Sequence, residues 1–289
     1  MPRFISLSLL ATLVSATICL WACGQNNGSL NAELTLEESS MPEAKYYSTD
    51  FVPVPDEVMD GLALGSVSED KALPFSEINR LTQPGSLEME NGYSLLEDGS
   101  AYVAVRTDFP GATGEMVYWW FWWHAMKDIR YKIWCPGAHY AIGVKDIEQL
   151  TNERLRDEKR FLGNPQYPVE DIGPGAMNLS IRFVPPKRFG FNTATFRKNG
   201  VAAVICGIVG FKAGEMTLEH TYVCHLFRKK GDGLELRSRF WLGERLNVPN
   251  IKKMIITEDL AMDMLLHCSQ EFNHLAGFLP NIYSEFAHP

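Results

Sequence analysis

The chain has 289 residues, of which 46% are hydrophobic and 21% charged; this suffices for one large or two small globular cores and is too apolar for a disordered protein. Its 35 acidic and 27 basic residues give a formal net charge of −8, so it lacks the general attraction to phosphate backbones and no nucleic-acid partner is expected. Many of its aromatic residues lie between Tyr102 and Trp134, where they could line a site for a flat apolar ligand or pack a core.

The first 23 residues have the pattern of an export signal. Arg3 is followed by an apolar stretch over residues 4–20 and by Cys23, after which the chain becomes polar. This stretch is short and poorly flanked for a membrane-spanning helix. Residues 20–23, LWAC, resemble a bacterial lipobox. Residues 1–23 therefore predict an exported protein, either periplasmic or held at the membrane by a lipid on Cys23. Trp21 is unusual in such a motif, so cleavage and release without lipid is the alternative.

Residues 24–72 are rich in Ser, Glu, Asn and Pro and show no sustained apolar periodicity, which predicts a tether followed by an irregular arm. Residues 73–289 are expected to form a single domain. Its widely spaced cysteines form no CxxC pair, so most are expected to be buried thiols, although an exported chain would also permit one disulfide. These cysteines are Cys135, Cys206, Cys224 and Cys268.

The first half of this domain predicts strands around one helix. Residues 101–107 alternate between apolar and polar as a strand does, and residues 113–127 contain no Pro and carry the broad apolar face of a buried helix. Short strands are expected over residues 131–134 and 138–144, on either side of a Pro-Gly turn.

The second half predicts longer strands and a closing helix. Residues 178–184 and 201–211 are expected to be strands, and residues 217–228 and 234–242 to form a hairpin around the turn KKGDG. A helix begins at Thr257 and continues for about five turns before Pro280 ends it. Antiparallel strands followed by one long helix indicate the α+β class, with the helix against a curved sheet.

Three polar residues lie on one face of the predicted closing helix. His267, Glu271 and His274 are four and three residues apart, and a His and a Glu four apart can reach the same metal ion. A carboxylate beside an imidazole suits zinc, with iron or manganese as other options. The same spacing also occurs in solvated polar stripes, so the pattern alone leaves both interpretations open.

Other polar residues lie in apolar surroundings. His139 belongs to a strand of apolar and small residues, Glu170 to the turn-like segment YPVEDIGPG, and His225 to a strand face opposite to that of His220. His124 ends the run WWFWWH and could be a helix-terminal cation or a pocket residue. GxSxG, P-loop, GxGxxG and HExxH motifs are absent from the sequence, which disfavours the corresponding hydrolase, nucleotide-binding and metallopeptidase functions.

Several segments together resemble the diacetylphloroglucinol and phloretin hydrolases. They are the aromatic run WWFWWH at residues 119–124, RYKIW at 130–134, Ala138-His139, RSRFWLG at 237–243 and the His267/Glu271 pair. They follow the family's order and cover roughly residues 101–286. The resemblance implies a zinc enzyme that cleaves the carbon–carbon bond between an acyl group and a phenolic ring. It also implies a helix-grip fold, a curved antiparallel sheet around a long C-terminal helix.

Family members hold zinc with two His and two Glu. The positions that match are His139, Glu170, His267 and Glu271. Glu153 and Glu158 are the fallback candidates for the loop Glu, and His274 becomes a helix neighbour that is not a ligand. Three features depart from the pattern and leave the substrate open: Ile142 replaces an expected polar substrate contact, Phe240 replaces a hydroxyl-bearing aromatic, and the export signal is unusual for the family.

The resemblance also suggests a mechanism. Zinc would polarise the acyl carbonyl of a small aromatic ketone and lower the pKa of a bound water, while the ring leaves as a stabilised enol after taking up a proton. Tyr131 and His225 are the candidates for supplying the proton and holding an oxyanion. Indole rings could form the walls for the aromatic substrate. These indoles are Trp120, Trp123 and Trp241.

Two other functions remain open from the sequence. The chain could be a lipid-tethered, non-catalytic binding protein for hydrophobic or aromatic ligands, in which case the four polar residues would coincide by chance. It could also be a metal hydrolase for another carbonyl, such as an ester or a β-diketone. The oligomeric state does not follow from the sequence, a homodimer being one option.

Overall fold

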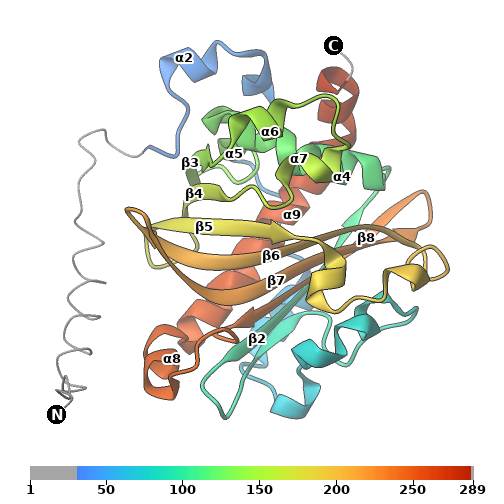
Figure 1. Ribbon diagram of the computed structural model, residues 1–289, viewed down its shortest axis with the longest axis vertical. Coiled ribbons are helices and arrows are strands. Elements are labelled where there is room, and N and C mark those ends of the chain that lie inside the picture. The colour runs from blue at the N-terminus through green and yellow to red at the C-terminus, as the bar shows by residue number, and fades with distance from the viewer. Residues whose placement is uncertain (1–30, 288–289) are drawn as a thin grey trace, which may run out of the picture.

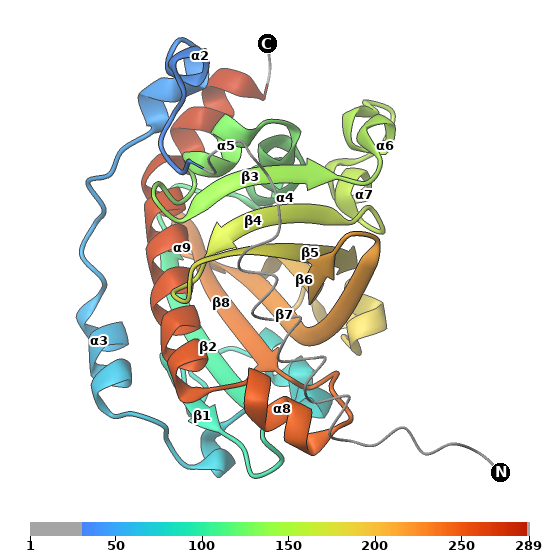
Figure 2. The same ribbon diagram turned by 90° about the vertical axis from the view of Figure 1, so that its left-hand side faces the viewer.

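The computed structural model describes residues 31–287, so the predicted signal at residues 1–23 and the lipid site at Cys23 lie outside the described residues. The described part contains one eight-stranded antiparallel sheet with the order β1-β2-β8-β7-β6-β5-β4-β3. A long C-terminal helix, α9 (Glu258–Phe286), lies across one face of this curved sheet (Figures 1 and 2). The α+β helix-grip fold is therefore confirmed. The strands are β1 (Gly92–Leu95), β2 (Ala101–Phe109), β3 (His139–Val144), β4 (Gln166–Asp171), β5 (Ala176–Val184), β6 (Val201–Ala213), β7 (Met216–Lys230) and β8 (Gly233–Leu242).

The two faces of the sheet bury two separate cores. Val223 and Phe227 of β7 point into the inner core beside α9, whereas Cys224 and Leu226 point into a smaller outer core. This alternation follows from the pleat of the strand. The outer core is covered by 3₁₀ segments, among them η3 (Phe75–Thr82) and η5 (Pro186–Phe189).

The aromatic run forms a buried helix, as predicted. Helix α4 (Gly114–Trp123) begins at Thr113, whose side chain accepts a hydrogen bond from the Met116 amide, and continues as the 3₁₀ turn η4 (His124–Met126). The strand predicted over residues 131–134 is wrong, because this segment belongs to helix α5 (Asp128–Lys132) and the turn after it. A run of four residues is too short for periodicity to separate strand from helix.

Helix α9 begins as predicted and ends later. The Thr257 side chain caps its first turn by accepting a hydrogen bond from the Leu260 amide at 3.2 Å. The prediction that Pro280 ends the helix is wrong, since the helix continues to Phe286. Leu279 and Ile282 are fully buried on either side of Pro280, so packing against the core outweighs the missing backbone hydrogen bond.

The β7–β8 hairpin is confirmed, with Lys230 paired to Gly233 and a two-residue turn between them. Gly231 in this turn has a φ of 58°, a value that favours glycine. The described part of residues 24–72 contains short helical pieces along the outside of the molecule (Figure 2). The remaining elements are α2 (Leu36–Ser39), η1 (Pro42–Tyr46), α3 (Asp56–Ala63), η2 (Glu69–Lys71), α6 (Ile147–Thr151), α7 (Asp157–Phe161), η6 (Thr193–Thr195) and α8 (Pro249–Ile255).

The cysteines of the folded domain are buried free thiols, as the sequence indicated for most of them; they are Cys135, Cys206, Cys224 and Cys268. Within residues 31–287, none of the helices combines the length and the apolar character that crossing a bilayer requires.

The RSRFWLG segment has a structural role on the outer side of β8. The Arg239 guanidinium is fully buried, pairs with Glu90 at 2.5 Å and donates to the Val105 and Met89 carbonyls. Arg239→Met is expected to destabilise the protein by about 3–5 kcal/mol, because the largely buried Glu90 loses its nearest cation and keeps only Arg237, at 3.9 Å. Urea unfolding measures the loss. Arg156→Met is the control, since the exposed Arg156–Glu158 pair should contribute less than about 1 kcal/mol; equal losses in the two variants would contradict the prediction.

Candidate metal centre

Sheet register and helix spacing bring the four predicted ligands together. His139 is the first residue of β3 and pairs directly with Glu170 of β4, although the two are far apart in the sequence. His267 and Glu271 lie one turn apart on α9. The segment around Glu170, which the sequence suggested to be turn-like, is a strand up to Asp171. The site thus joins the β3–β4 pair to the closing helix.

The ligand atoms are close enough to share one ion. Ligand atoms of His139, Glu170 and His267 all lie within 4.8 Å of one another. The His139 Nε2 atom lies 3.7 Å from Glu170 Oε2 and 3.8 Å from Glu271 Oε2, and His267 Nε2 lies 4.0 Å from the same oxygen of Glu271. Ligands of a tetrahedral zinc ion are about 3.4 Å apart, so small adjustments would complete the coordination.

The hydrogen bonding of His139 fixes which of its nitrogens faces the site. Its Nδ1 lies 3.0 Å from the Tyr131 carbonyl oxygen, which can only accept, so Nδ1 carries the proton. The Nε2 lone pair therefore faces Glu170 and Glu271. This fully buried atom has no hydrogen-bond partner. A lone pair that faces two ionised carboxylates is unfavourable by itself and suits a bound cation, so these residues fit a divalent metal.

Burial shifts the pKa values of all four groups toward their neutral forms. It raises the pKa of Glu170 to about 7, against the opposing hydrogen bond from Tyr131, and it raises the pKa of Glu271 well above its usual value, with a further contribution from Glu170. It also lowers the pKa of His139 well below the usual range and that of His267 to about 4. Within residues 31–287 no lysine or arginine pairs with either carboxylate, so a divalent cation would supply the missing positive charge.

These shifts predict the pH dependence of the chelator-treated protein. Because the pKa of Glu170 is about 7 in the folded protein against a usual 4.5, the folded state binds more protons than the unfolded chain between these values. Glu170 should therefore lower the free energy of unfolding as pH rises through this window, by about 3 kcal/mol in total. The imidazoles of His139 and His267, neutral when folded, act in the opposite sense below pH 6.5.

Comparison with Glu170→Gln isolates this contribution. Urea unfolding in EDTA at pH 5 and pH 8 should show a stability advantage of the variant over the parent that grows with pH. An advantage that is equal at both pH values would contradict a carboxyl group with a raised pKa.

The two predicted catalytic residues occupy different surroundings. The Tyr131 ring stacks on His139 with centroids 3.9 Å apart, and its hydroxyl donates to Glu170 Oε2. His225 of β7 shares a hydrogen bond with Ser238 at 2.9 Å, and its ring packs against Phe272. Tyr131 thus touches the metal ligands directly. His225 is connected to the metal ligands only indirectly: its ring contacts Phe272, Phe272 contacts Trp134, and Trp134 contacts His139.

Burial sets the protonation of both residues. It raises the pKa of Tyr131 well above 10, aided by Glu170, so the phenol keeps its proton. It lowers the pKa of His225 to about 3, so the imidazole is neutral.

In the aromatic region, the prediction for Trp241 and one of the two alternatives left open for His124 are wrong. Trp241 cannot form a wall of this site, because it lies in the outer core and its indole donates to the Leu73 carbonyl at 2.7 Å. His124 is not a helix-terminal cation, because burial lowers its pKa to about 4. Trp120 and Trp123 pack in the inner core, where Trp120 contacts the Trp134 ring.

The other residues considered as ligands do not belong to the centre. Glu153 is exposed and Glu158 pairs with Arg156 at 3.0 Å, so neither fallback candidate lies at the centre. His274 contacts the Phe51 ring, with centroids 4.9 Å apart. Sequence reasoning missed Trp134, whose indole donates to the Glu271 carbonyl at 3.1 Å. Trp134 belongs to the RYKIW segment that carries the family resemblance, and this membership could have marked it as a site residue.

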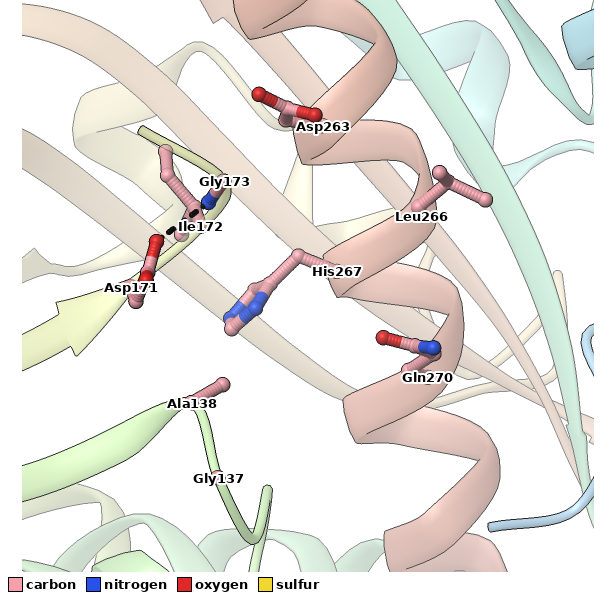
Figure 3. A pocket seen from close by; sticks show the side chains of 9 residues that line it. All are labelled: Gly137, Ala138, Asp171, Ile172, Gly173, Asp263, Leu266, His267 and Gln270. Atoms are coloured by element: carbon pink, nitrogen blue, oxygen red, sulfur yellow. Dashed lines mark hydrogen bonds between the residues drawn. The ribbon is translucent and has the colours of Figure 1, made fainter. Parts of the chain in front are cut away.

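A pocket of about 290 Å³ lies beside the centre and has His267 in its lining. Figure 3 shows the His267 ring extending from α9 toward Ala138 and Asp171, with Asp263 one turn earlier on the helix. This volume is close to the lower limit for small-molecule sites. One candidate ligand, His267, therefore lines a space that could hold a small molecule. Its other lining residues are Gly137, Ile172, Gly173, Leu266 and Gln270.

The solved structures that match this chain share little sequence identity with it and have low TM-scores. Protein Ms6760 from Mycobacterium smegmatis is 12% identical, with a TM-score of 0.38 over 63% of this chain and 92% of its own. Ara h 8.0201 is 9% identical, with a TM-score of 0.39 over 62% of this chain and 97% of its own.

Two curated hydrolases are much more similar to this chain in sequence. A 2,4-diacetylphloroglucinol hydrolase of Pseudomonas protegens is 33% identical over 264 residues, covering 86% of this chain and 85% of the relative. A phloretin hydrolase of Eubacterium ramulus is 33% identical over 257 residues, which cover 86% of this chain and 92% of that relative. The family model described as the DAPG hydrolase PhiG domain matches residues 73–284. The resemblance inferred from the aromatic run and the RSRFWLG segment is thus confirmed, and the chain belongs to the DAPG hydrolase family.

Proposed function

We propose that this chain is a zinc-dependent hydrolase that cleaves the carbon–carbon bond between an acyl group and a phloroglucinol-like ring. The names of its relatives support the reaction and the substrate class. The observation that carries the metal dependence is the buried, unpartnered Nε2 atom of His139, which faces Glu170 and Glu271. In a binding protein without a metal, this arrangement would be a coincidence.

Four residues would hold the metal: His139, Glu170, His267 and Glu271. Zinc bound there supplies a Lewis acid for the acyl carbonyl. The carboxylates of Glu170 and Glu271 balance the charge of the ion. The hydrogen bond from His139 Nδ1 to the Tyr131 carbonyl keeps the imidazole in the tautomer and orientation that a ligand needs.

In the overall reaction, water gives its hydroxyl to the acyl carbon and a proton to the ring carbon, and the bond between these two carbons breaks. Tyr131 is our candidate for moving that proton, because its hydroxyl lies against Glu170 and keeps its proton at neutral pH. Glu170 accepts the hydrogen bond and orients the phenol, and the proton that Tyr131 gives to the ring carbon is replaced by the proton that water releases. The ring hydroxyls of the substrate make the step feasible, because they stabilise the departing enol.

His225 is our candidate for orienting an oxygen of the substrate. Its neutral ring lies 5.7 Å from the Phe240 ring on the inner face of the sheet. The family resemblance implies a hydroxyl-bearing aromatic at the position of Phe240, so a polar contact beside His225 would be missing in this chain. We therefore propose that the substrate has a less polar substituent near Phe240 than the phloroglucinols of the relatives.

We further propose that the protein acts after export, on the basis of the apolar stretch and the LWAC motif in residues 1–23. Its substrate would then be an extracytoplasmic acylphenol. Expression of the full chain followed by membrane fractionation and mass determination of the mature N-terminus tests this proposal; an uncleaved cytoplasmic protein would overturn it.

The reaction is tested by measuring bound metal in the purified chain and incubating it with diacetylphloroglucinol and phloretin. We expect about one zinc per chain and the release of a carboxylic acid and the deacylated ring in equal amounts, abolished by EDTA and restored by zinc. Acetophenone is the matched control, because it lacks the ring hydroxyls and should not be cleaved. Bound zinc with turnover only of esters or β-diketones would overturn the substrate class, and a stable metal-free protein with a co-purified ligand would overturn the enzyme.

A further inference from the structure

The N-terminal arm, residues 31–72, contacts helix α5 on both sides of Tyr131. Glu43, which is only 2% exposed, accepts hydrogen bonds from Arg130 Nε at 2.9 Å and from Lys127 Nζ at 3.2 Å. Glu38 accepts a hydrogen bond from Lys132 Nζ at 2.8 Å. The two residues that flank Tyr131 in the sequence are therefore each held by a carboxylate of the arm.

Arg130 and Lys132 depend on these partners because both are buried, at 8% and 4% exposure. The Arg130 guanidinium stacks on the Trp123 ring at 3.9 Å and donates to the Trp123 carbonyl. Neither contact neutralises its charge. A buried cation without its anion moves toward water. Removal of an arm carboxylate should therefore shift α5 rather than leave it in place.

A shift of α5 would act on the metal centre through Tyr131. The Tyr131 carbonyl accepts the hydrogen bond that fixes the His139 tautomer, its ring stacks on His139, and its hydroxyl donates to Glu170. One residue thus supports two of the four candidate ligands with both its backbone and its side chain. Its position depends on the short helix that the arm holds.

We propose that Glu43 and Glu38 are positioning residues, through which the arm clamps α5 from both sides and holds Tyr131 against His139 and Glu170. This inference rests on the proposed function, since it assigns the purpose of the clamp to that site. It predicts that a segment without any metal-ligand candidate of its own controls the turnover number.

Glu43→Gln tests the clamp, because it keeps the shape of the side chain and removes the charge. We expect a fall in kcat of about tenfold with KM changed less than twofold, as for residues that orient metal ligands from outside the coordination sphere. Hydrogen exchange of residues 128–134 should accelerate. Glu38→Gln should have the same effect in weaker form, and Glu43→Asp should recover part of the lost kcat.

Glu285→Gln is the matched control. Glu285 binds Lys45 and Tyr46 of the same arm at the end of α9, so this variant loosens the arm without touching α5. Its kcat and the exchange of residues 128–134 should match the parent. Equal effects of Glu43→Gln and Glu285→Gln would overturn the clamp in favour of general arm docking, as would parental kcat and exchange in Glu43→Gln. Failure of the parent to cleave any acylphenol would instead overturn the proposed function, and the exchange measurement would still decide whether the arm fixes α5.

Discussion

Glu271→Gln is expected to lower zinc affinity at least tenfold and to reduce acylphloroglucinol cleavage to background while the protein stays folded. The amide keeps the size of the side chain but loses the charge that makes the carboxylate a good ligand. The metal-free variant should also be more stable than the metal-free parent above neutral pH, since it removes a buried group whose ionisation burial opposes. Elemental analysis after dialysis against limiting zinc, turnover assays and urea unfolding give the three readouts.

Glu158→Gln is the control for this prediction. Glu158 is a fallback candidate for the glutamate ligand from the loop, but it lies in an ion pair with Arg156. It should keep its zinc and its activity. A Glu271→Gln variant with parental zinc and turnover would show that Glu271 is no ligand. The site would then reduce to His139, Glu170 and His267, whose ligand atoms all lie within 4.8 Å of one another.

Half of this site is local in the sequence and half is not. The spacing of His267 and Glu271 fixes their shared helical face, so any amphipathic helix at that place presents both to one ion. His139 and Glu170 meet only because β3 pairs with β4 in a particular register. No periodicity within either segment specifies that register, and only the family resemblance could supply these two residues.

The incorrect predictions have physical causes. Trp241 and Phe240 are neighbours in one strand, so they point to opposite faces, but which face meets α9 depends on the pairing of β8 with β7. Pro280 lies inside α9 because tertiary packing outweighs a local helix breaker. The fold class was predictable because the alternating strands and the closing helix are long enough for their periods to be read.

Tyr131→Phe is expected to lower kcat by about 10²–10⁴-fold, the usual range for loss of a group that transfers a proton. The variant keeps the ring that stacks on His139 and the carbonyl that holds its Nδ1, so it should retain stoichiometric zinc when the metal is in excess. A metal-ligand variant loses metal and turnover together, whereas this one should separate them. Metal content and single-turnover rates with diacetylphloroglucinol measure the two effects.

Tyr140→Phe provides the comparison, because Tyr140 follows His139 in β3 and is half-buried, yet the proposed reaction does not use its hydroxyl. Its kcat should match the parent within about twofold. If Tyr131→Phe also retains parental turnover, the proton must come from elsewhere, and a fall in kcat for His225→Gln with Tyr131 intact would transfer that role to the imidazole on β7. A loss of zinc from Tyr131→Phe would instead show that the hydroxyl serves mainly to hold Glu170 in its ligand position.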